Sequence, residues 1–340
     1  MLMQIDTQSA VWSGTPVGAP VLEVRGLRVS FPTRFDTVNA VSDVSLSIRK
    51  GEILGVVGES GAGKSMTGLA TLGLLEPPGH ISAGEIYLSG KRIDNLPDRE
   101  MEKIRGRRIG AIFQDPLTSL HPLFTIGAQL VDTIRLHLKL TRAQAKRRAV
   151  DLLKEVGIPA PEDRVNDYPH QFSGGMRQRV VIALALAAEP ELIIADEPTT
   201  ALDVSVQAQI MALLRRLCDD RGAAVMLVTH DMGVIAETAD RVAVLYAGRV
   251  IEVGSVEEIT RAPKHPYTVG LMGSIPPLRA RVPRLTQIDG VMPRPDAIPA
   301  GCPFNPRCAK AGPRCLRDLP PLVDVAGTKT ACWLYSGGVN

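Results

Sequence analysis

The stretch EILGVVGESGAGKSMTGLATLGLL, residues 52–75, decides the fold of this chain. It begins with a short apolar run typical of a buried strand, continues through a glycine-rich turn, and ends in a run of helix-forming residues. Within it, Gly58, Gly63, Lys64 and Ser65 match the spacing G-x4-G-K-[ST] of a phosphate-binding loop. A strand, a glycine loop and a helix in this order predict an α/β protein that binds a nucleotide.

The residue types of this P-loop suit a triphosphate. Its glycines let the backbone turn N–H groups inward around phosphate oxygens, Lys64 adds positive charge at the outer phosphates, and the Ser65 hydroxyl can bind Mg²⁺. A plain glycine turn is the alternative, but the complete spacing between a strand and a helix favours nucleotide binding. The predicted contacts here are Gly58, Glu59, Ser60, Gly61, Ala62, Gly63, Lys64, Ser65 and Met66.

A second buried strand ends in two adjacent carboxylates. The stretch ELIIADEPTTALD, residues 191–203, contains the apolar run LIIA followed by Asp196 and Glu197. α/β sheets bind their ligands at the carboxyl ends of strands. We therefore expect Asp196 to hold Mg²⁺ and Glu197 to orient or deprotonate the water that attacks the γ-phosphate. A solvated charge pair on a loop is the alternative, which the presence of the P-loop disfavours.

The stretch FSGGMRQR, residues 172–179, resembles the signature motif of ATP-binding cassette (ABC) ATPases. The other motifs of that family occur in its order: Gln114 in AIFQDP resembles the Q-loop, TALD ending at Asp203 the D-loop, and His230 in LVTHD the switch histidine. The resemblance covers residues 21–254. It implies an ABC-type P-loop NTPase fold, with a RecA-like core, an antiparallel β subdomain and a helical subdomain.

The signature motif departs from the usual family pattern at two positions. The family has Leu first and Gln fifth, where this chain has Phe172 and Met176, which removes one polar contact. Ser173, Gly174 and Gly175 are intact and open a helix, whose N-terminus suits a γ-phosphate. The resemblance implies that they face the ATP of a partner subunit, so that two cassettes close head to tail over two nucleotides.

The resemblance also assigns roles to single side chains. It implies that Glu197, His230 and Gln114 are catalytic, with His230 contacting the γ-phosphate and Gln114 sensing Mg²⁺ and the attacking water. A lone histidine after a strand is more often structural, and only the order of the other motifs reverses that interpretation. The implied Mg²⁺ ligands are Ser65, Gln114 and Asp196. Beyond the P-loop, the predicted nucleotide contacts are Phe31, Gln114, Ser173, Gly174, Gly175, Asp196, Asp203 and His230.

An aromatic side chain before the P-loop would stack on the adenine in this family. Phe31 in LRVSF ends an alternating strand, whereas Phe35 lies in the turn that follows. Phe31 is therefore the better candidate, although either ring could instead belong to the core.

Composition restricts the class of protein. With 340 residues and 45% hydrophobic side chains, the chain can bury a sizeable core, and its 39 basic and 36 acidic residues predict no nucleic-acid partner. The longest apolar run, VVIALALAA at 180–188, is about half of what a bilayer-crossing helix needs. The N-terminus has an Asp and no cationic start, so we expect no secretory signal, a cytoplasmic location and reduced thiols.

Three segments are expected along the chain: a flexible N-terminus at 1–19, an ABC ATPase domain at 20–258, and a C-terminal extension at 259–340. Within the ATPase domain, GAQLVDTIRLHLKL and TRAQAKRRAVDLLKEVG have apolar residues at helical spacing. They match the family's helical subdomain, which we place at about 111–180. The extension is expected to be small, irregular and rich in Pro and Cys.

A finer resemblance is to the ATPases of oligopeptide and dipeptide importers. It is carried by QDPLTSLHPLFTIGAQL at 114–130, YPHQFSGGMRQRVVIALAL at 168–186, and HPYT at 265–268, which opens the Pro-rich extension. It implies import of dipeptides, oligopeptides or a related small solute, such as nickel or glutathione. The implied partners are a second ABC ATPase subunit, favoured to be a paralogue, two transmembrane permeases and an extracytoplasmic solute-binding protein. The implied location is peripheral, on the cytoplasmic face of the inner membrane.

The alternative is a soluble ABC ATPase that acts on the ribosome or nucleic acid. Such proteins usually have two cassettes in one chain or a long coiled-coil insertion between the P-loop and the signature motif. The 107 residues between Ser65 and Ser173 leave no room for that coil.

Four of the five cysteines gather near the C-terminus. Cys302, Cys308, Cys315 and Cys332 are separated by five, six and sixteen residues, whereas Cys218 lies in an amphipathic helical stretch and is expected in the core. Four thiolates among prolines and glycines can fold loops around a metal centre. The absence of paired C-x2-C weakens zinc without excluding it, and free thiols are a further alternative. Resemblance to importer ATPases with this arrangement implies a [4Fe-4S] cluster with a structural or redox-sensing role.

Overall fold

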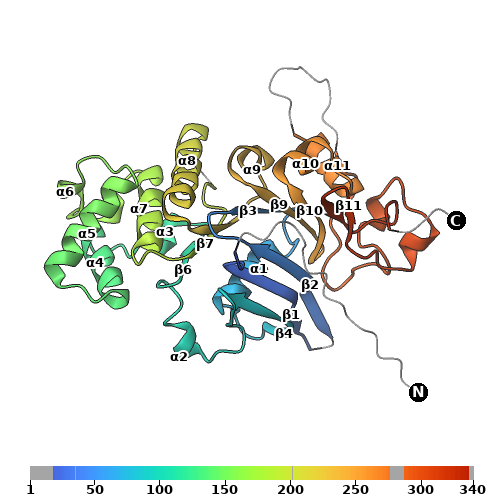
Figure 1. Cartoon of the computed structure of the whole chain (residues 1–340), viewed down its shortest axis with the longest axis horizontal. Helices are drawn as coiled ribbons and strands as arrows, with labels where there is room; N and C mark the ends of the chain where they lie inside the picture. The colour runs from blue at the N-terminus through green and yellow to red at the C-terminus, as the bar shows by residue number, and fades with distance from the viewer. Residues whose placement is uncertain (1–17, 35, 201, 276–286, 337–340) are drawn as a thin grey trace.

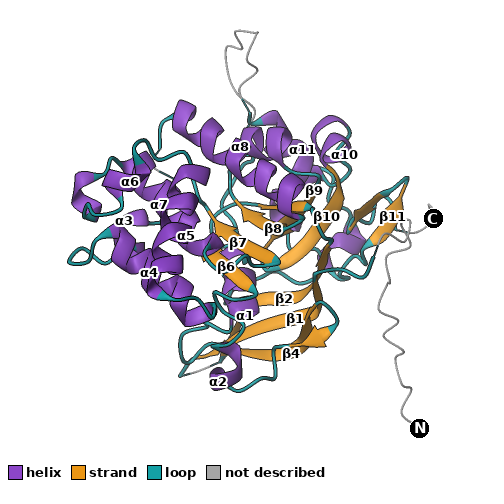
Figure 2. Ribbon diagram, turned by 60° about the vertical axis from the view of Figure 1, so that its left-hand side comes forward, coloured by secondary structure: helices purple, strands orange, loops and turns teal. Residues whose placement is uncertain are grey.

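Two sheets form the framework of the protein, whose structure is a computed structural model describing residues 18–34, 36–200, 202–275 and 287–336 (Figures 1 and 2). The smaller sheet is antiparallel, in the order β2-β1-β4-β5. Its strands are β1 (Leu22–Pro32), β2 (Thr37–Ile48), β4 (His80–Leu88) and β5 (Lys91–Arg92). The larger sheet has eight strands in the order β11-β12-β10-β9-β3-β8-β7-β6. They are β3 (Ile53–Val57), β6 (Ile109–Ile112), β7 (Leu192–Asp196), β8 (Ala224–Val228), β9 (Arg241–Tyr246), β10 (Arg249–Ser255), β11 (Val323–Val325) and β12 (Thr328–Thr330).

The centre of the larger sheet is parallel and fully covered. Strands β9, β3, β8, β7 and β6 run parallel, and all residues of β3 and β8 are buried. Their sequences, ILGVV and AVMLV, are continuous apolar runs without alternation, as expected of strands covered on both faces. The structure thereby confirms the predicted α/β fold class, the strand before the P-loop and the helix after it, and the strand that ends at Asp196.

The helices fall into two groups. Those of the first group pack against the sheets: α1 (Lys64–Leu72), α2 (Asp98–Met101), α8 (Val204–Arg221), α9 (Met232–Thr238), α10 (Val256–Arg261) and α11 (Pro266–Gly273). Those of the second lie together at one end of the molecule (Figure 1): α3 (Pro116–Ser119), α4 (Ile126–His137), α5 (Arg142–Glu155), α6 (Pro161–Arg164), the 3-10 turn η1 (Pro169–Gln171) and α7 (Gly174–Leu186). Helices α4 and α5 confirm the two stretches predicted as helical. The limits of the helical subdomain stay a prediction.

Local sequence signals explain where these helices begin. Thr141 accepts a hydrogen bond from the backbone N–H of Gln144, whose side chain in turn accepts one from the Thr141 N–H, so a capping box starts α5. Thr125 caps α4 in a similar way through the N–H of Ala128. Each cap satisfies backbone donors that the first turn of a helix leaves without partners.

Helix α1 lies between the two sheets. Buried residues of the small sheet, such as Leu22, pack in one cluster with Ala70 of α1 and with Leu54 and Val228 of the large sheet. The other face of the large sheet shares a second cluster with the helices at the end of the molecule. The P-loop at the start of α1 is therefore held from both sides by packed strands.

The C-terminal extension is only partly irregular. Two 3-10 turns, η2 (Asn305–Arg307) and η3 (Pro313–Leu316), precede the hairpin β11–β12. This hairpin adds to the large sheet through pairing of β12 with β10, while most of the rest of the extension is irregular, as expected. The expected flexible N-terminus falls largely in residues 1–17, which lie outside the described residues, as do 276–286 and 337–340.

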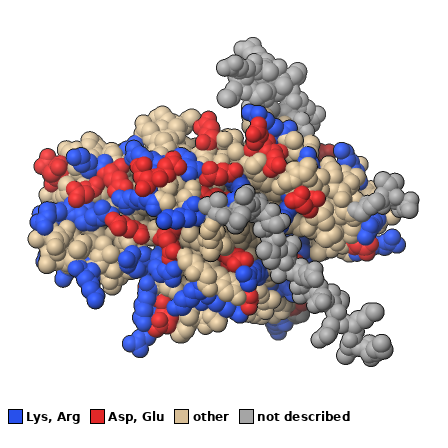
Figure 3. Space-filling model, viewed as in Figure 1, with Lys and Arg blue, Asp and Glu red and all other residues tan. Residues whose placement is uncertain are grey.

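On the face shown in Figure 3, the described Lys and Arg side chains are interspersed with Asp and Glu. No helix in the described ranges is both long and apolar enough to cross a bilayer.

Candidate active site

The P-loop joins β3 to α1 through backbone conformations that need glycine. Gly58 has φ 150°, and a Cβ on it would lie 2.3 Å from the carbonyl oxygen of Leu245. Gly63 has φ 96°, and its Cβ would lie 2.9 Å from the carbonyl oxygen of Ala40. Any side chain at either position would clash with the backbone of another strand. The two glycines of the motif are thus required by the packing of the loop.

Lys64 is folded back over the loop. Its Nζ donates to the carbonyl oxygens of Gly58, at 2.8 Å, and Glu59, at 3.0 Å, and the side chain is buried. Burial lowers the pKa of Lys64, and the nearby Glu197 and Asp196 partly offset that effect. The ammonium group therefore sits inside the loop beside two carboxylates, where the outer phosphates of a nucleotide would be its strongest partners.

Ser65 and Asp196 meet at the predicted Mg²⁺ position. The Ser65 Oγ, in the first turn of α1, donates to the Asp196 Oδ1, at the end of β7, over 3.0 Å. Burial raises the pKa of Asp196 against the opposing effect of this hydrogen bond. A hydroxyl and a carboxylate are the hard oxygen ligands that Mg²⁺ prefers, so these residues fit the ion.

Glu197 is the centre of a hydrogen-bonded group. Its Oε2 accepts from the Gln114 Nε2 at 3.2 Å and from the Thr200 Oγ1 at 2.9 Å, and its Oε1 lies 3.1 Å from the His230 Nδ1. The backbone of Glu197 is left-handed, with φ 47°. Burial raises the pKa of Glu197, but hydrogen bonds from His230 and Thr200 outweigh it, and the pKa lies below its ordinary value. The carboxylate is therefore ionised and can accept a proton.

The structure thus brings Gln114, Glu197 and His230 together from three separate segments. Thr200 was missed in the sequence, although it follows Glu197 by three residues, the spacing of a turn in which the Thr200 N–H donates to the Glu197 carbonyl oxygen.

The signature motif lies apart from this group. Ser173 caps α7, its Oγ accepting from the Met176 N–H at 3.4 Å, and it is exposed to solvent. A Cβ on Gly175 would lie 2.7 Å from the Val206 side chain at the start of α8. Across the described residues, no hydrogen bond or ion pair joins 173–175 to the P-loop at 58–65. Within the described residues, the two predicted phosphate-binding segments are therefore not joined by hydrogen bonds or ion pairs.

Asp203 of the D-loop is engaged as a helix cap. Its Oδ1 accepts from the Val206 N–H at 2.9 Å and from the Ser205 Oγ at 3.0 Å, and these hydrogen bonds lower the pKa of Asp203. It fixes the start of α8 next to the signature motif.

Phe31 lies at the end of β1 and is half-buried. A Cβ on Gly79 would lie 2.5 Å from its ring, so the ring packs closely against that turn. Its stacking on adenine stays a prediction, and Phe35 lies outside the described residues.

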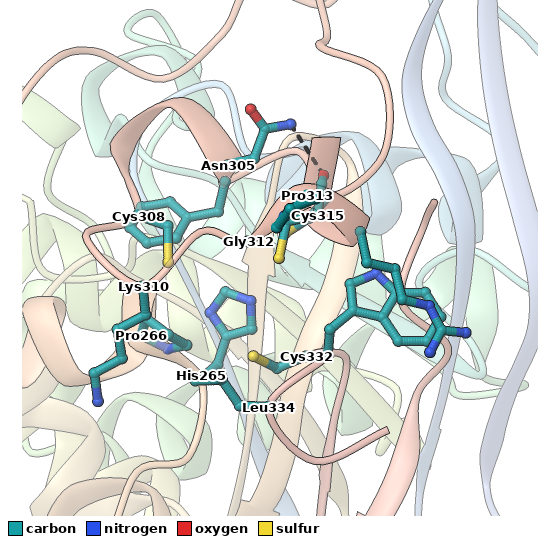
Figure 4. A pocket seen from close by; sticks show the side chains of 14 residues that line it. His265, Pro266, Asn305, Cys308, Lys310, Gly312, Pro313, Cys315, Cys332 and Leu334 are labelled. Carbon is teal, nitrogen blue, oxygen red and sulfur yellow. Dashed lines mark hydrogen bonds between the residues drawn. The ribbon is translucent and has the colours of Figure 1, made fainter. Parts of the chain in front are cut away.

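One cavity of about 250 Å³ is lined by four cysteines: Cys302, Cys308, Cys315 and Cys332 (Figure 4). Burial raises the pKa of Cys302 to about 11 and also raises those of Cys308 and Cys332. In the described part of the chain, no group of three or more His, Cys, Asp or Glu side chains is arranged as a ready-made metal site. The donor chemistry suits an iron–sulfur cluster, but the thiols are not arranged as a closed set of ligands around one ion.

Cys218 is separate from this cavity. It lies in α8 with 1% of its surface exposed, and burial raises its pKa to about 12, which confirms it as a core residue.

Comparison with known proteins gives matches to both parts of the chain. Residues 41–200 match the family described as ABC transporter, and residues 251–315 match the family described as oligopeptide/dipeptide transporter, C-terminal region.

Two relatives come from Bacillus subtilis (strain 168). The chain is 48% identical over 310 residues to the oligopeptide transport ATP-binding protein OppD, covering 91% of this chain and 87% of that protein. It is 47% identical over 316 residues to the dipeptide transport ATP-binding protein DppD, covering 92% and 94%.

A solved structure of the ATP-binding cassette MJ0796, a dimer in a post-hydrolysis state bound to ADP and Pi, is also similar. Its TM-score is 0.63 at 31% identity, and the match covers 69% of this chain and 98% of that one. The identities and coverage of the relatives are high enough to establish kinship. The chain therefore belongs to the ABC transporter family, among ATP-binding proteins whose C-terminal region is that of oligopeptide and dipeptide transporters.

Proposed function

We propose that this chain is the ATP-hydrolysing subunit that energises import of dipeptides, oligopeptides or a related small solute through separate permease subunits. The observation that carries this proposal is the group around Glu197, an ionised carboxylate held by Gln114, Thr200 and His230 beside a P-loop. The relatives named for oligopeptide and dipeptide transport support the class of solute.

The chemistry follows from the positions of the side chains. On binding ATP, the Lys64 Nζ would exchange the carbonyls of the P-loop for phosphate oxygens, and Ser65 and Asp196 would hold Mg²⁺, which would supply positive charge at the phosphates. Glu197 accepts a proton from a water whose oxygen attacks the γ-phosphorus, the bond to the β-phosphate oxygen breaks, and ADP leaves with its electron pair. Gln114 orients the water, and His230 supports the γ-phosphate. Charge stabilisation and positioning supply most of the rate enhancement.

The site is complete only in a pair of subunits. Ser173, Gly174 and Gly175 are available at the start of α7, and we propose that they bind the γ-phosphate held by a partner cassette, with Asp203 supporting the contact. The solved dimer of a similar cassette supports this arrangement. The partner is favoured to be a paralogue of this chain.

The proposed partners outside the pair are two transmembrane permeases and an extracytoplasmic solute-binding protein, with this subunit peripheral on the cytoplasmic face of the inner membrane. The proposed organisation is a flexible N-terminus at 1–19, an ATPase domain at 20–258 with its helical subdomain at about 111–180, and an extension at 259–340.

The experiment combines purification and transport. An affinity-tagged chain should co-purify from membranes with two permeases, and its deletion should abolish growth on defined peptides as sole amino-acid source. A soluble chain that instead co-purifies with ribosomes or nucleic acid, with peptide growth intact, would establish the alternative function.

We further propose that Cys302, Cys308, Cys315 and Cys332 hold a [4Fe-4S] cluster, which would tie together the loops around their shared cavity. Zinc is the weaker alternative, because the cysteines lack the paired C-x2-C spacing of common zinc sites. Anaerobic purification tests this: iron with visible absorbance supports the cluster, equimolar zinc supports the alternative, and a colourless protein without either metal contradicts both.

A further inference from the structure

Arg307 reaches from the cysteine segment into the P-loop. It lies in η2, next to Cys308, yet its Nη1 and Nη2 each donate to one carboxylate oxygen of Glu59, both at 3.0 Å. This bidentate pair joins residues 248 positions apart in the sequence. Only 6% of the Arg307 side chain is exposed, against 29% for Glu59. A surface ion pair contributes little, but this one is largely shielded from water.

The remaining donors of Arg307 are also used. Nε donates to the carbonyl oxygen of Asp289 at 2.9 Å, Nη1 donates to the Tyr246 hydroxyl at 3.3 Å, and Nη2 is 3.5 Å from the carbonyl oxygen of Ile288. All five N–H groups of the guanidinium therefore have acceptors. A side chain fixed in this way holds one geometry, which a flexible lysine could not do.

A second contact from the C-terminal region reaches the same residue of the P-loop. The backbone N–H of Glu59 donates to the hydroxyl of Tyr267, in α11, at 3.0 Å. The Tyr267 ring packs against Tyr246 and Phe304, with ring centroids 4.7 and 5.5 Å apart. Phe304 follows Cys302 by two residues. The carboxylate and the amide of Glu59 are thus both held by residues outside the P-loop and outside the motifs of the ATPase.

Glu59 needs such a partner for an electrostatic reason. It is one of the carboxylates whose charge acts on Lys64, the residue that binds the outer phosphates. An unpaired carboxylate in this loop would repel a triphosphate and compete with it for the Lys64 ammonium group. The guanidinium of Arg307 cancels that charge without occupying the loop.

We propose that Arg307 is a positioning residue of the nucleotide site: by pairing with Glu59 it neutralises and orders the P-loop, so that the C-terminal extension contributes to ATP affinity. This inference rests on the proposed nucleotide site around Lys64. The competing explanation is that the ion pair only docks the extension onto the ATPase domain, with no effect on nucleotide binding.

The test measures the Kd of the full-length protein for the non-hydrolysable analogue AMP-PNP with Mg²⁺, by calorimetry. Arg307→Gln leaves the Glu59 carboxylate unpaired and should weaken binding about tenfold. The double variant Glu59→Gln with Arg307→Gln removes both charges and should bind within about threefold of wild type. Arg317→Gln, an exposed arginine of the same extension, is the matched control and should leave the Kd unchanged.

The salt dependence of the Kd is a further test. If the ion pair only docked the extension, the loss of affinity in Arg307→Gln would not depend on ionic strength. Because Glu59 is partly exposed, the defect of Arg307→Gln should shrink as ionic strength rises. If Arg307→Gln binds as tightly as wild type, or the double variant binds as weakly as Arg307→Gln, the proposal is overturned. If Arg307→Gln does not fold, the Kd of the double variant decides. Tenfold weaker AMP-PNP binding by the double variant than by wild type would also overturn the proposal.

Lys64→Ala separates failure of this inference from failure of the proposed nucleotide site. If Lys64→Ala loses binding while Arg307→Gln does not, only the inference is wrong. If Lys64→Ala binds AMP-PNP as tightly as wild type, the nucleotide site is not at Lys64, and the inference about Arg307 is wrong as well.

Discussion

Helices α1 and α7 both begin at glycine-containing motifs, but their N-termini are surrounded by different groups. Helix α1 has no side-chain cap, and Lys64 at its start is buried beside carboxylates. Helix α7 is capped by the Ser173 hydroxyl and opens to solvent. Neither has an acidic residue in its first turn, where one would oppose an anion. The first N-terminus lies beside the proposed catalytic groups of its own chain, whereas the second lies apart from them and is suited to bind a ligand held by another subunit.

This difference explains why one chain can have two proposed phosphate-binding segments but only one proposed catalytic carboxylate. The hydrogen bond of Ser65 with Asp196 and that of His230 with Glu197 both lie within one chain. A Cβ on Gly174 would meet Leu202 and one on Gly175 would meet Val206, so these two glycines face the residues at the start of α8. Substitutions in these two regions should therefore show whether each region affects nucleotide binding or ATP turnover.

The largest effect is expected from Glu197→Gln. The amide cannot accept a proton, so ATP turnover should fall about a hundredfold or more, while AMP-PNP binding is retained and the closed pair accumulates. Steady-state phosphate release and size-exclusion chromatography with ATP measure both results. Glu189→Gln is a matched control, because Glu189 is exposed and also has positive φ, at 54°. Turnover at the wild-type rate by Glu197→Gln would mean that the base is another residue.

A substitution at Ser173 tests the second helix N-terminus. Asp caps a helix about as well as Ser, so Ser173→Asp should preserve α7 while placing a negative charge against the γ-phosphate of a partner's ATP. Binding of AMP-PNP by the P-loop should stay within about twofold of wild type, and ATP turnover should fall about thirtyfold.

Ser173→Asn is the control for that charge, because Asn caps equally well and is neutral. It should lose only a small part of the turnover. Equal turnover by the Asp and Asn variants would remove the distinction between the two N-termini, because the second would then not approach a phosphate.

Much of the fold and half of the site were predictable because their signals are local. The P-loop spacing, the apolar run before Asp196 and the helical spacing in 126–155 each lie within one short window, and the structure has the predicted elements there. The assembly of Gln114 with Glu197 follows from parallel strands β6 and β7 ending at one edge.

The contacts between the extension and the P-loop were not predictable. Tyr267 and Arg307 meet Glu59 from 208 and 248 residues away, and no periodicity or spacing relates such distant positions. The hairpin β11–β12 was missed for another reason: its strands have three residues each, too few for an alternating pattern. Its turn at Ala326 and Gly327, both with positive φ, was the available signal.

The smallest effect is expected where the signature motif departs from its family, at Met176. The Met176 side chain packs against the core beneath α7, while its backbone N–H, which any residue supplies, donates to Ser173. Met176→Gln adds the polar group usual in the family, so turnover at saturating ATP should rise, by no more than about threefold, at a cost of about 1 kcal/mol in the free energy of unfolding. Met176→Leu keeps the packing without the polar group and should leave turnover unchanged. Phosphate release and urea unfolding measure the two quantities. If Met176→Gln changes turnover as much as Ser173→Asp does, the fifth position and not the helix N-terminus controls the second half of the site.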